Sequence, residues 1–244
     1  MCTVTIIPCA NGVRLACNRD ESLLRPAALP PCEVACGNRR AVMPIDPLSN
    51  GTWIAGNDAG LIATLLNVYE RPFDRQTPPS RCSRGTIIPW LMETNTLAEA
   101  YERSLGIVSE EFAAFRLVIA DGQAFAEVYV SGNSVIRKPP VPINAPLLFT
   151  SSGLGDGVVE PPRRALFESL FTKNANWREQ QEMYHRHSWP ERRHVSVCML
   201  RPEARTISFS AVESTSNGVV MTYHGAAPDQ HAQRFDAVLG IAKA

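Results

Sequence analysis

The chain has 244 residues, of which 45% are hydrophobic and 20% are charged, and its formal net charge is zero. This composition is typical of a soluble globular protein with a substantial core. The neutral balance argues against long-range attraction to nucleic acid or to an anionic membrane surface. No apolar run approaches the roughly 20 residues that a membrane-spanning helix requires. We therefore expect no nucleic-acid partner and no membrane span.

The cysteines indicate a reducing compartment. There are seven, at positions 2, 9, 17, 32, 36, 82 and 198. An odd number without paired spacing argues against a framework of disulfides. The start of the sequence also lacks the basic stretch, apolar segment and small-residue cleavage site of a signal peptide. We therefore expect a cytoplasmic protein.

The N-terminal part of the chain predicts paired strands. Residues 2–8 and 13–18 are rich in β-branched and apolar side chains, and the Asn11-Gly12 between them is a strong hairpin signal. Two more strands are expected at 52–57 and 61–67, joined by a short turn.

Helices and strands then follow in groups. Two helices are expected within 83–107, with Asn95 or Thr96 as an N-cap, and Pro161-Pro162 is expected to open a third. The third and fourth helices are expected to cover 163–171 and 177–187. The remaining expected strands are 115–121, 125–131, 134–138, 147–151, 194–201, 205–213 and 219–225.

Strands that return as hairpins between pairs of helices predict antiparallel sheets with helices outside them. A parallel doubly wound sheet would need strict alternation of strand and helix. No low-complexity linker and no internal repeat divides the sequence, so we expect a single domain over 1–244.

Cys2 is the first candidate for chemistry. Aminopeptidases remove an initiator methionine when the next side chain is small, and Cys2 would then carry a thiol of pKa about 8.5 beside an amine of pKa about 7.7–8.0. Such an amine can act as the general base for its own thiol. No histidine lies near this end, because all five lie at position 185 or later. The alternative is that Cys2 is a small apolar residue that begins an edge strand.

The first hairpin returns the segment NRDE to the neighbourhood of Cys2. With a two-residue Asn-Gly turn Cys2 lies opposite Glu21, and with a three-residue loop it lies opposite Asp20. Pro8 cannot donate a ladder hydrogen bond, so a bulge that shifts this register is plausible. In either register we expect a carboxylate to hold the terminal amine and Arg19 to lower the pKa of the thiol.

The sequence resembles the NRDE family, which includes the transport and Golgi organisation protein 2 group. The segments that carry the resemblance follow one another in order: CNRDE at 17–21 after the MC start, NGTWIAGNDAGLIATLLN at 50–67, SRGTIIPWLM at 83–92, FTSSGLGD at 149–156 and HVSVCMLRPEARTISFS at 194–210. This family is similar to the N-terminal nucleophile (Ntn) hydrolases. The resemblance implies an α+β fold class, a four-layer αββα sandwich of two antiparallel sheets between helical layers.

Within that fold, the resemblance to choloylglycine hydrolases and penicillin V acylases implies roles for individual residues. Cys2 matches their nucleophile, Asp20 the nearby acidic residue, Asn67 an asparagine that stabilises the oxyanion, and Arg193 a late arginine of the site. With Arg19, these are the expected catalytic residues. Those acylases carry an arginine where this chain has Cys17, and a second asparagine where it has Ser151.

The candidate substrate-binding residues are Asn18, Glu21, Trp53 and Ser151. For Trp53 the alternative is core packing beside the site, and for Asn67 it is a turn-forming hydrogen bond.

The function that the resemblance implies is an amidase or acylase that acts on non-peptide carbon–nitrogen bonds through a Cys2 thioester. Its substrate is expected to be a small molecule with an amide or acyl group, and no cofactor is expected. Relatives of this fold often form oligomers, so a homo-oligomer is also considered. The family is further linked with haem handling and with lipid or membrane trafficking. The alternative is therefore a non-catalytic ligand-binding protein on the same fold.

Two other motifs are weak. Cys32 and Cys36 with His185 and His187 lack the C-x₂-C spacing that is typical of zinc sites, so we expect no metal. The segment SGLGDG at 152–157 lies between a strand and a helix, as phosphate loops do. It lacks the Gly-x-Gly-x-x-Gly order and a following Lys-Ser/Thr, so we expect it to form a glycine-rich rim of the pocket.

Overall fold

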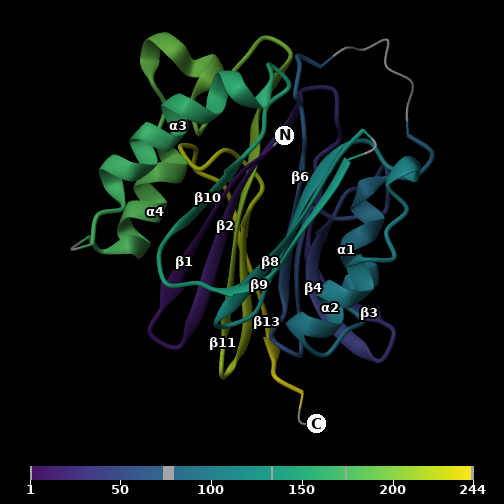
Figure 1. Ribbon diagram of the computed structural model, residues 1–244. Coiled ribbons are helices and arrows are strands. Elements are labelled where there is room, and N and C mark those ends of the chain that lie inside the picture. Colours follow the sequence, from purple (N-terminus) through teal and green to yellow (C-terminus); the bar gives the residue numbers. More distant parts are fainter. Residues whose placement is uncertain (1, 74–79, 133, 174, 243–244) are drawn as a thin grey trace.

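The computed structural model describes residues 2–73, 80–132, 134–173 and 175–242. Two antiparallel sheets stack face to face, and a pair of helices covers the outer face of each (Figure 1). These are the four layers of an αββα sandwich. Met1, whose removal is expected from the sequence, lies outside the described residues, and so does Asn133 of an expected turn.

The first sheet contains the hairpin that begins with Cys2. Its strands lie in the order β10-β1-β2-β11-β12-β13. Their bounds are β1 (Cys2–Cys9), β2 (Gly12–Ser22), β10 (Leu147–Thr150), β11 (Ala204–Thr215), β12 (Gly218–His224) and β13 (Arg234–Gly240). Strand β1 is therefore an inner strand with β10 and β2 on its two sides, and not the edge strand of the alternative interpretation.

The strands of the second sheet follow one another in chain order. They are β3 (Leu29–Cys36), β4 (Arg39–Ile45), β5 (Ile54–Asn57), β6 (Ile62–Asn67), β7 (Phe115–Ala120), β8 (Ala124–Ser131) and β9 (Ser134–Pro142). Each is antiparallel to its neighbour.

The helices form the two outer layers. α3 (Asp156–Leu170) and α4 (Trp177–Arg186) lie over the first sheet, and α1 (Ile87–Leu91) and α2 (Leu97–Ser104) lie over the second (Figure 1). Short 3₁₀ turns are η1 (Arg84–Thr86), η2 (Ser109–Glu111) and η3 (Pro190–Val195). Thr96 caps α2 by accepting a hydrogen bond from the Glu99 N–H, as one of the two sequence alternatives predicts.

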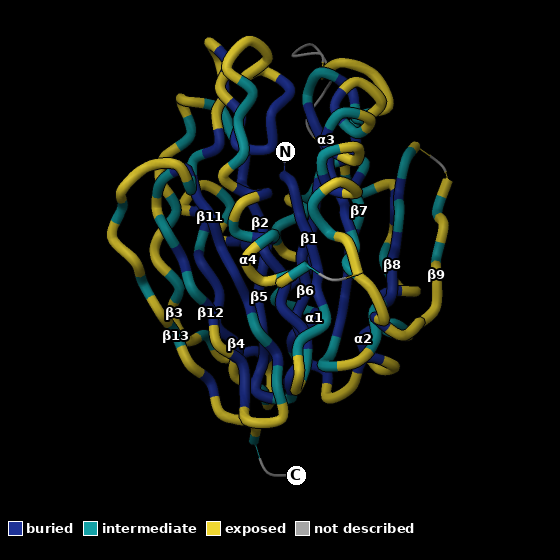
Figure 2. The backbone as a smooth tube through the Cα atoms, turned by 90° about the vertical axis from the view of Figure 1, so that its left-hand side faces the viewer, coloured by how far each residue is buried: buried dark blue, intermediate teal, exposed yellow. Residues whose placement is uncertain are grey.

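The main core lies between the sheets, and the central strands of both sheets are mostly dark blue in Figure 2. In strand β1 successive side chains point to opposite faces of the sheet, so alternate residues meet different surroundings. Val4 and Ile6 are fully buried in the inter-sheet core, and each such burial contributes about 1.5–3 kcal/mol. Thr3 and Thr5, equally buried, face the α3/α4 layer and make polar contacts there.

The register of the first hairpin differs from both expected alternatives. The turn is Ala10-Asn11, Gly12 pairs with Cys9, and Cys2 pairs with Arg19, not with Glu21 or Asp20. Gly12 belongs to the ladder because β11 approaches it closely: a Cβ there would lie 1.9 Å from the Ser214 carbonyl oxygen. The ladder also passes Pro8 without the bulge that the sequence suggested.

Two further elements differ from those expected from the sequence, and tertiary packing explains both differences. α3 begins at Asp156 and holds Pro161 and Pro162 inside it, because its buried residues, among them Val159, sit on the sheet at helical spacing. The strand expected at 194–201 is mostly η3 and loop. In that segment the carbonyls of Val195 and Ser196 accept hydrogen bonds from Arg163, so they are not available to a strand ladder.

Three strands are additional to the expected ones: β3, β4 and β13. β3 lies at a sheet edge and contains Pro30 and Pro31, with a register shift between Leu29 and Cys32. Prolines are tolerated at such positions because an edge strand leaves half of its N–H groups unpaired. They obscure the strand pattern in the sequence.

Candidate active site

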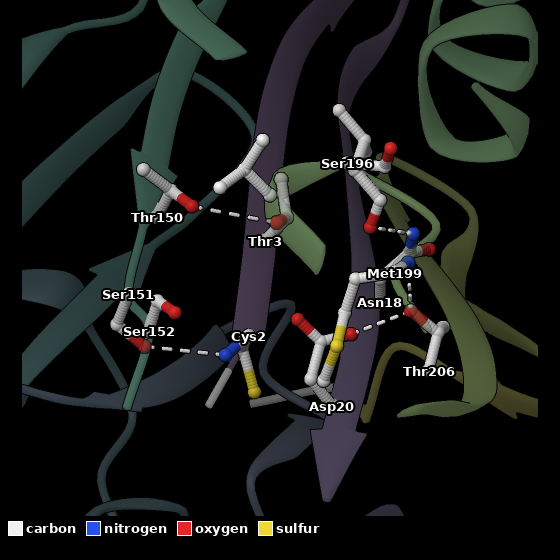
Figure 3. A network of polar contacts seen from close by, with 12 residues as sticks. Cys2, Thr3, Asn18, Asp20, Thr150, Ser151, Ser152, Ser196, Met199 and Thr206 are labelled. Carbon is white, nitrogen blue, oxygen red and sulfur yellow. Dashed lines mark hydrogen bonds between the residues drawn. The ribbon is translucent and has the colours of Figure 1, made fainter. Parts of the chain in front are cut away.

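Cys2 is held at the beginning of β1 by main-chain hydrogen bonds to the residue that follows β10 (Figure 3). Its N–H donates to Ser151 Oγ at 3.2 Å, and its carbonyl oxygen accepts from the Ser151 N–H at 2.9 Å. The side chain is only 4% exposed and belongs to the inter-sheet core cluster. It also forms part of the wall of a cavity at this end of the sandwich.

This cavity has a volume of about 290 Å³. It brings together six of the residues that the sequence singled out, namely Cys2, Arg19, Asp20, Glu21, Trp53 and Asn67. They come from β1, β2, the segment before β5 and the end of β6, so both sheets contribute. The cavity is therefore the candidate active site.

Cys17 is the immediate partner of the Cys2 thiol. It lies on β2, fully buried, two residues before the partner of Cys2. As a donor to the Cys2 sulfur, its thiol lowers the pKa of Cys2; burial and the Asp20 carboxylate oppose this, and the charge of Arg19 supports it. The same interaction raises the pKa of Cys17 well above its usual value. Cys2 is therefore the thiol of the pair that ionises.

Asp20 is buried in a polar layer beneath the α3 helix. Thr206 Oγ1 donates a hydrogen bond of 2.6 Å to Asp20 Oδ1, and Arg163 Nη2 lies 3.9 Å from Oδ2. Burial raises the pKa of Asp20, while Arg163 and Thr206 act against the rise. Arg163 also donates to the hydroxyls of Thr3 and Thr150 at 2.8 and 2.7 Å, which fixes the layer to β1 and β10. Figure 3 shows Asp20 bound to Thr206.

Arg19 and Trp53 form one wall of the cavity. The Arg19 guanidinium lies 4.2 Å from the centroid of the Trp53 ring and forms an ion pair with Asp46. Two buried nitrogens here, Arg19 Nη1 and Trp53 Nε1, have no hydrogen-bond partner among the described residues. Because an unpaired buried donor is costly, these two groups suit an oxygen acceptor brought by a ligand.

Asn67 reaches the cavity from the end of β6. Its Nδ2 donates to the Tyr69 hydroxyl at 2.9 Å. Arg84, at the start of η1, also lines the cavity; it donates to the Ala114 carbonyl at 2.8 Å, and burial lowers its pKa. Four residues at or beside the cavity were not predicted from the sequence: Tyr69, Arg84, Asp46 and Thr206. Arg84 lies within one of the segments that carry the family resemblance, and Tyr69 lies two residues after another. This proximity is the only sign in the sequence that they belong to the site.

Three predicted site residues are not among those that line the cavity in the described part of the chain: Ser151, which contacts the main chain of Cys2 instead, Asn18 and Arg193. Asn18 is fully buried on the face of β2 that α3 and α4 cover, where its Nδ2 donates to the carbonyls of His185 and Val197 at 2.9 and 3.0 Å. Arg193 is exposed on η3. The late arginine whose charge acts on Asp20 is Arg201, together with Arg163.

The glycine-rich loop after β10 is occupied by its own carboxylate. Asp156 accepts hydrogen bonds from the N–H groups of Ser152 at 2.7 Å and of Tyr69 at 3.0 Å. A phosphate would have to displace it. Among the described residues, no group of three or more His, Cys, Asp or Glu side chains is arranged to hold a metal ion.

Three solved structures share this architecture. The C2A mutant of conjugated bile acid hydrolase from Clostridium perfringens is 12% identical, with a TM-score of 0.54 over 98% of this chain and 92% of that one. Penicillin V acylase from Agrobacterium tumefaciens is 13% identical, with a TM-score of 0.52 over 98% and 86%. The Caenorhabditis elegans ortholog of N-acylethanolamine-hydrolyzing acid amidase is 12% identical, with a TM-score of 0.56 over 93% of each chain.

All three are Ntn hydrolases, so the class defined here is a protein with the Ntn-hydrolase fold, as predicted. The profile of the family described as Transport and Golgi organisation 2 matches residues 1–190. The chain belongs to this family, which confirms the resemblance seen in the sequence. No curated protein matches it significantly. Within the described ranges, every helix is too short or too polar to cross a lipid bilayer.

Proposed function

We propose that the protein is an N-terminal cysteine hydrolase, an amidase or acylase that cleaves a non-peptide carbon–nitrogen bond of a small molecule through a Cys2 thioester. One observation carries the proposal: a thiol of lowered pKa at the start of β1 lies on a cavity that Asn67 also lines. The Ntn-hydrolase fold of the three similar structures supports it.

Removal of Met1 is the first requirement. It converts the Cys2 nitrogen, which lies 3.2 Å from Ser151 Oγ, from an amide into an amine. The Cys2 thiolate then attacks the carbonyl carbon of the substrate, and the protonated Cys2 amine gives its proton to the departing nitrogen as the carbon–nitrogen bond breaks. Water hydrolyses the thioester, which releases the carboxylic acid and restores the thiol.

The tetrahedral intermediates place negative charge on the former carbonyl oxygen. The Asn67 Nδ2 carries two hydrogens, and one of them serves the Tyr69 hydroxyl. The other is the donor that we assign to the oxyanion. Donors fixed before the reaction stabilise the transition state without reorganisation.

A second cavity gives the acyl group of the substrate a place. It has a volume of about 490 Å³ and shares Glu21, Tyr69 and Phe73 with the first. Its other lining residues include Leu24, Pro72 and Leu154. The groove also carries Arg201 and Glu203, but more of its surface is apolar than polar. A polar chamber next to such a groove suits a substrate with an amide group and an apolar acyl chain.

The same groove supports the alternative, a carrier that binds a lipid or haem without turnover. The two functions differ in what they require of Cys2. A carrier does not need a free Cys2 amine or a nucleophilic thiol, whereas the hydrolase needs both.

The test combines intact mass spectrometry of the purified protein with turnover of N-acyl amides of increasing chain length. We expect Met1 to be absent, hydrolysis to be lost in Cys2→Ala, and an acyl adduct to form on the peptide that contains Cys2. The control is Cys9→Ala, because Cys9 ends the same strand far from the cavity and is only half-buried. A retained Met1, or equal turnover by Cys2→Ala and the unmutated protein, would overturn the hydrolase and favour the carrier.

A further inference from the structure

The two buried thiols at the cavity form a pair with a defined geometry. Cys2 pairs with Arg19 and Val4 pairs with Cys17, so Cys2 and Cys17 are diagonal neighbours on adjacent strands. Since paired and diagonal residues two apart project from the same face of a sheet, both side chains point into the inter-sheet core, and both belong to its cluster. Cys17 is also the neighbour that acts most strongly on the pKa of the Cys2 thiol.

The members of this pair differ in reactivity. Cys2 lines the cavity and so is open to small solutes, whereas Cys17 is fully buried behind it. A peroxide oxidises a thiolate, and Cys2 is the thiol that ionises. The largest cause of the raised pKa of Cys17 is its hydrogen bond to Cys2. Once the Cys2 sulfur is an uncharged sulfenic acid, its negative charge no longer opposes ionisation of Cys17.

We propose that Cys2 and Cys17 form a reversible disulfide when the protein meets a peroxide. In the first step the Cys2 thiolate attacks one oxygen of the peroxide, the O–O bond breaks, and Cys2–SOH and hydroxide (or alkoxide) are formed. In the second step the Cys17 sulfur attacks the Cys2 sulfur, the S–O bond breaks, and water leaves. Sulfur is oxidised and peroxide oxygen is reduced, with no other reactant.

The bond requires the backbone to move. Disulfides span Cα atoms about 4.4–6.8 Å apart, and diagonal neighbours across two strands lie about 7–8 Å apart. Cys2 is the first residue of β1, so the remaining gap can close through a shift at the end of one strand. The other five cysteines lie elsewhere in the fold: Cys9, Cys32, Cys36, Cys82 and Cys198.

A bond between these sulfurs removes the nucleophile and protects it from irreversible oxidation to sulfinic acid. This consequence rests on the proposed hydrolase, but the disulfide itself does not. The modification would make turnover dependent on the redox state, and thiol reductants would restore it.

The experiment treats the purified protein with hydrogen peroxide and maps tryptic peptides without reduction. Cleavage after Arg14 and Arg19 places Cys17 in the peptide 15–19, apart from Cys2. We expect a mass lower by two hydrogens, a cross-link between Cys2 and Cys17 located by fragmentation, and loss of both after dithiothreitol. The cross-link should persist in Cys9→Ser. In Cys17→Ser, Cys2 should instead gain oxygens that dithiothreitol does not remove.

Oxidation of the unmutated protein without this cross-link would overturn the proposal, and so would equal recovery of Cys2 in Cys17→Ser and Cys9→Ser. Should Cys17→Ser fail to fold, the peptide map of the unmutated protein decides the question alone. Hydrolysis is measured separately. A cross-link in a protein that turns over nothing in either redox state would contradict the hydrolase and leave the disulfide standing.

Discussion

Ser151 holds Cys2 through two reciprocal contacts, one to its nitrogen at 3.2 Å and one to its carbonyl oxygen at 2.9 Å. Only the first uses the serine side chain. In the proposed mechanism that hydroxyl orients the amine that serves as base and acid. The side chain therefore affects the chemistry, and the main-chain contact maintains the pairing of β1 with β10.

We predict that Ser151→Ala lowers kcat/KM for amide hydrolysis by roughly tenfold to a hundredfold, since a hydrogen bond to a charged group contributes about 1.5–3 kcal/mol. Ser151→Thr keeps the hydroxyl and should recover most of the activity. The two variants are compared by steady-state kinetics across pH. Equal activity in both would show that the hydroxyl does not act on the amine.

Cys17→Ala should raise the pKa of Cys2, because the thiolate loses the S–H donor that lowers it most. Alkylation of Cys2 by iodoacetamide should then reach half its maximal rate at a higher pH. The rate is followed by the mass of the peptide that contains Cys2. Cys9→Ala is the control and should leave the midpoint unchanged; a midpoint unchanged in Cys17→Ala as well would contradict the assigned interaction.

Asn67→Ala should reduce kcat by roughly 10²–10³-fold, the usual effect of removing one oxyanion donor. Tyr69→Phe is the matched variant, because it removes the hydroxyl that accepts from Asn67 Nδ2 and leaves the amide in place. We expect a smaller reduction from it. If the two substitutions reduce kcat equally, Asn67 acts through Tyr69 and not on the substrate.

His185 should make the fold sensitive to mild acid. It is fully buried, with Nε2 2.8 Å from Thr5 Oγ1 and Nδ1 3.0 Å from Asn18 Oδ1, and burial lowers its pKa from 6.5 to about 3. As the pH falls below 6.5, His185 binds a proton in the unfolded chain but stays neutral in the folded protein. The free energy of unfolding should therefore fall by about 2 kcal/mol between neutral pH and about pH 5.

The measurement is the pH dependence of the free energy of unfolding from urea titrations. His185→Gln should remove this part of the slope, whereas His231→Gln, at an exposed position, should retain it. Asp20 contributes with the opposite sign, because its raised pKa favours the folded state as it becomes protonated. A slope that His185→Gln leaves intact would contradict the assignment.

The elements that the sequence predicts well are those with a strong local pattern. Strand β1, its return in β2 and the Thr96 cap follow from side-chain alternation, turn residues and capping chemistry within a few positions. The register of the hairpin does not, because the close approach of Ser214 in β11 to Gly12 decides it. That contact joins residues about two hundred positions apart, so no local pattern contains it.

Some residues of the candidate site could likewise be predicted from the sequence, and others could not. The start of β1 and the end of β6 bring Cys2 and Asn67 to one cavity, as the family motifs suggest. An arginine in the sequence does not reveal whether it will be buried: Arg193 is exposed, while Arg163 is fully buried beside Asp20. The role of Cys17 also depends on the strand register, which the turn residues alone predict wrongly.

The position of β1 between β2 and β10 has a consequence for folding. One neighbour follows within a few residues, but the other begins at Leu147, and β2 in turn pairs with β11, which begins at Ala204. Contacts at such sequence separations have a high loop-closure cost and form slowly. The groups that lower the pKa of the thiol, Cys17 and Arg19, already lie in the local hairpin, whereas the cavity that gives the thiol its access is lined from both sheets and is complete only after distant parts of the polypeptide have met.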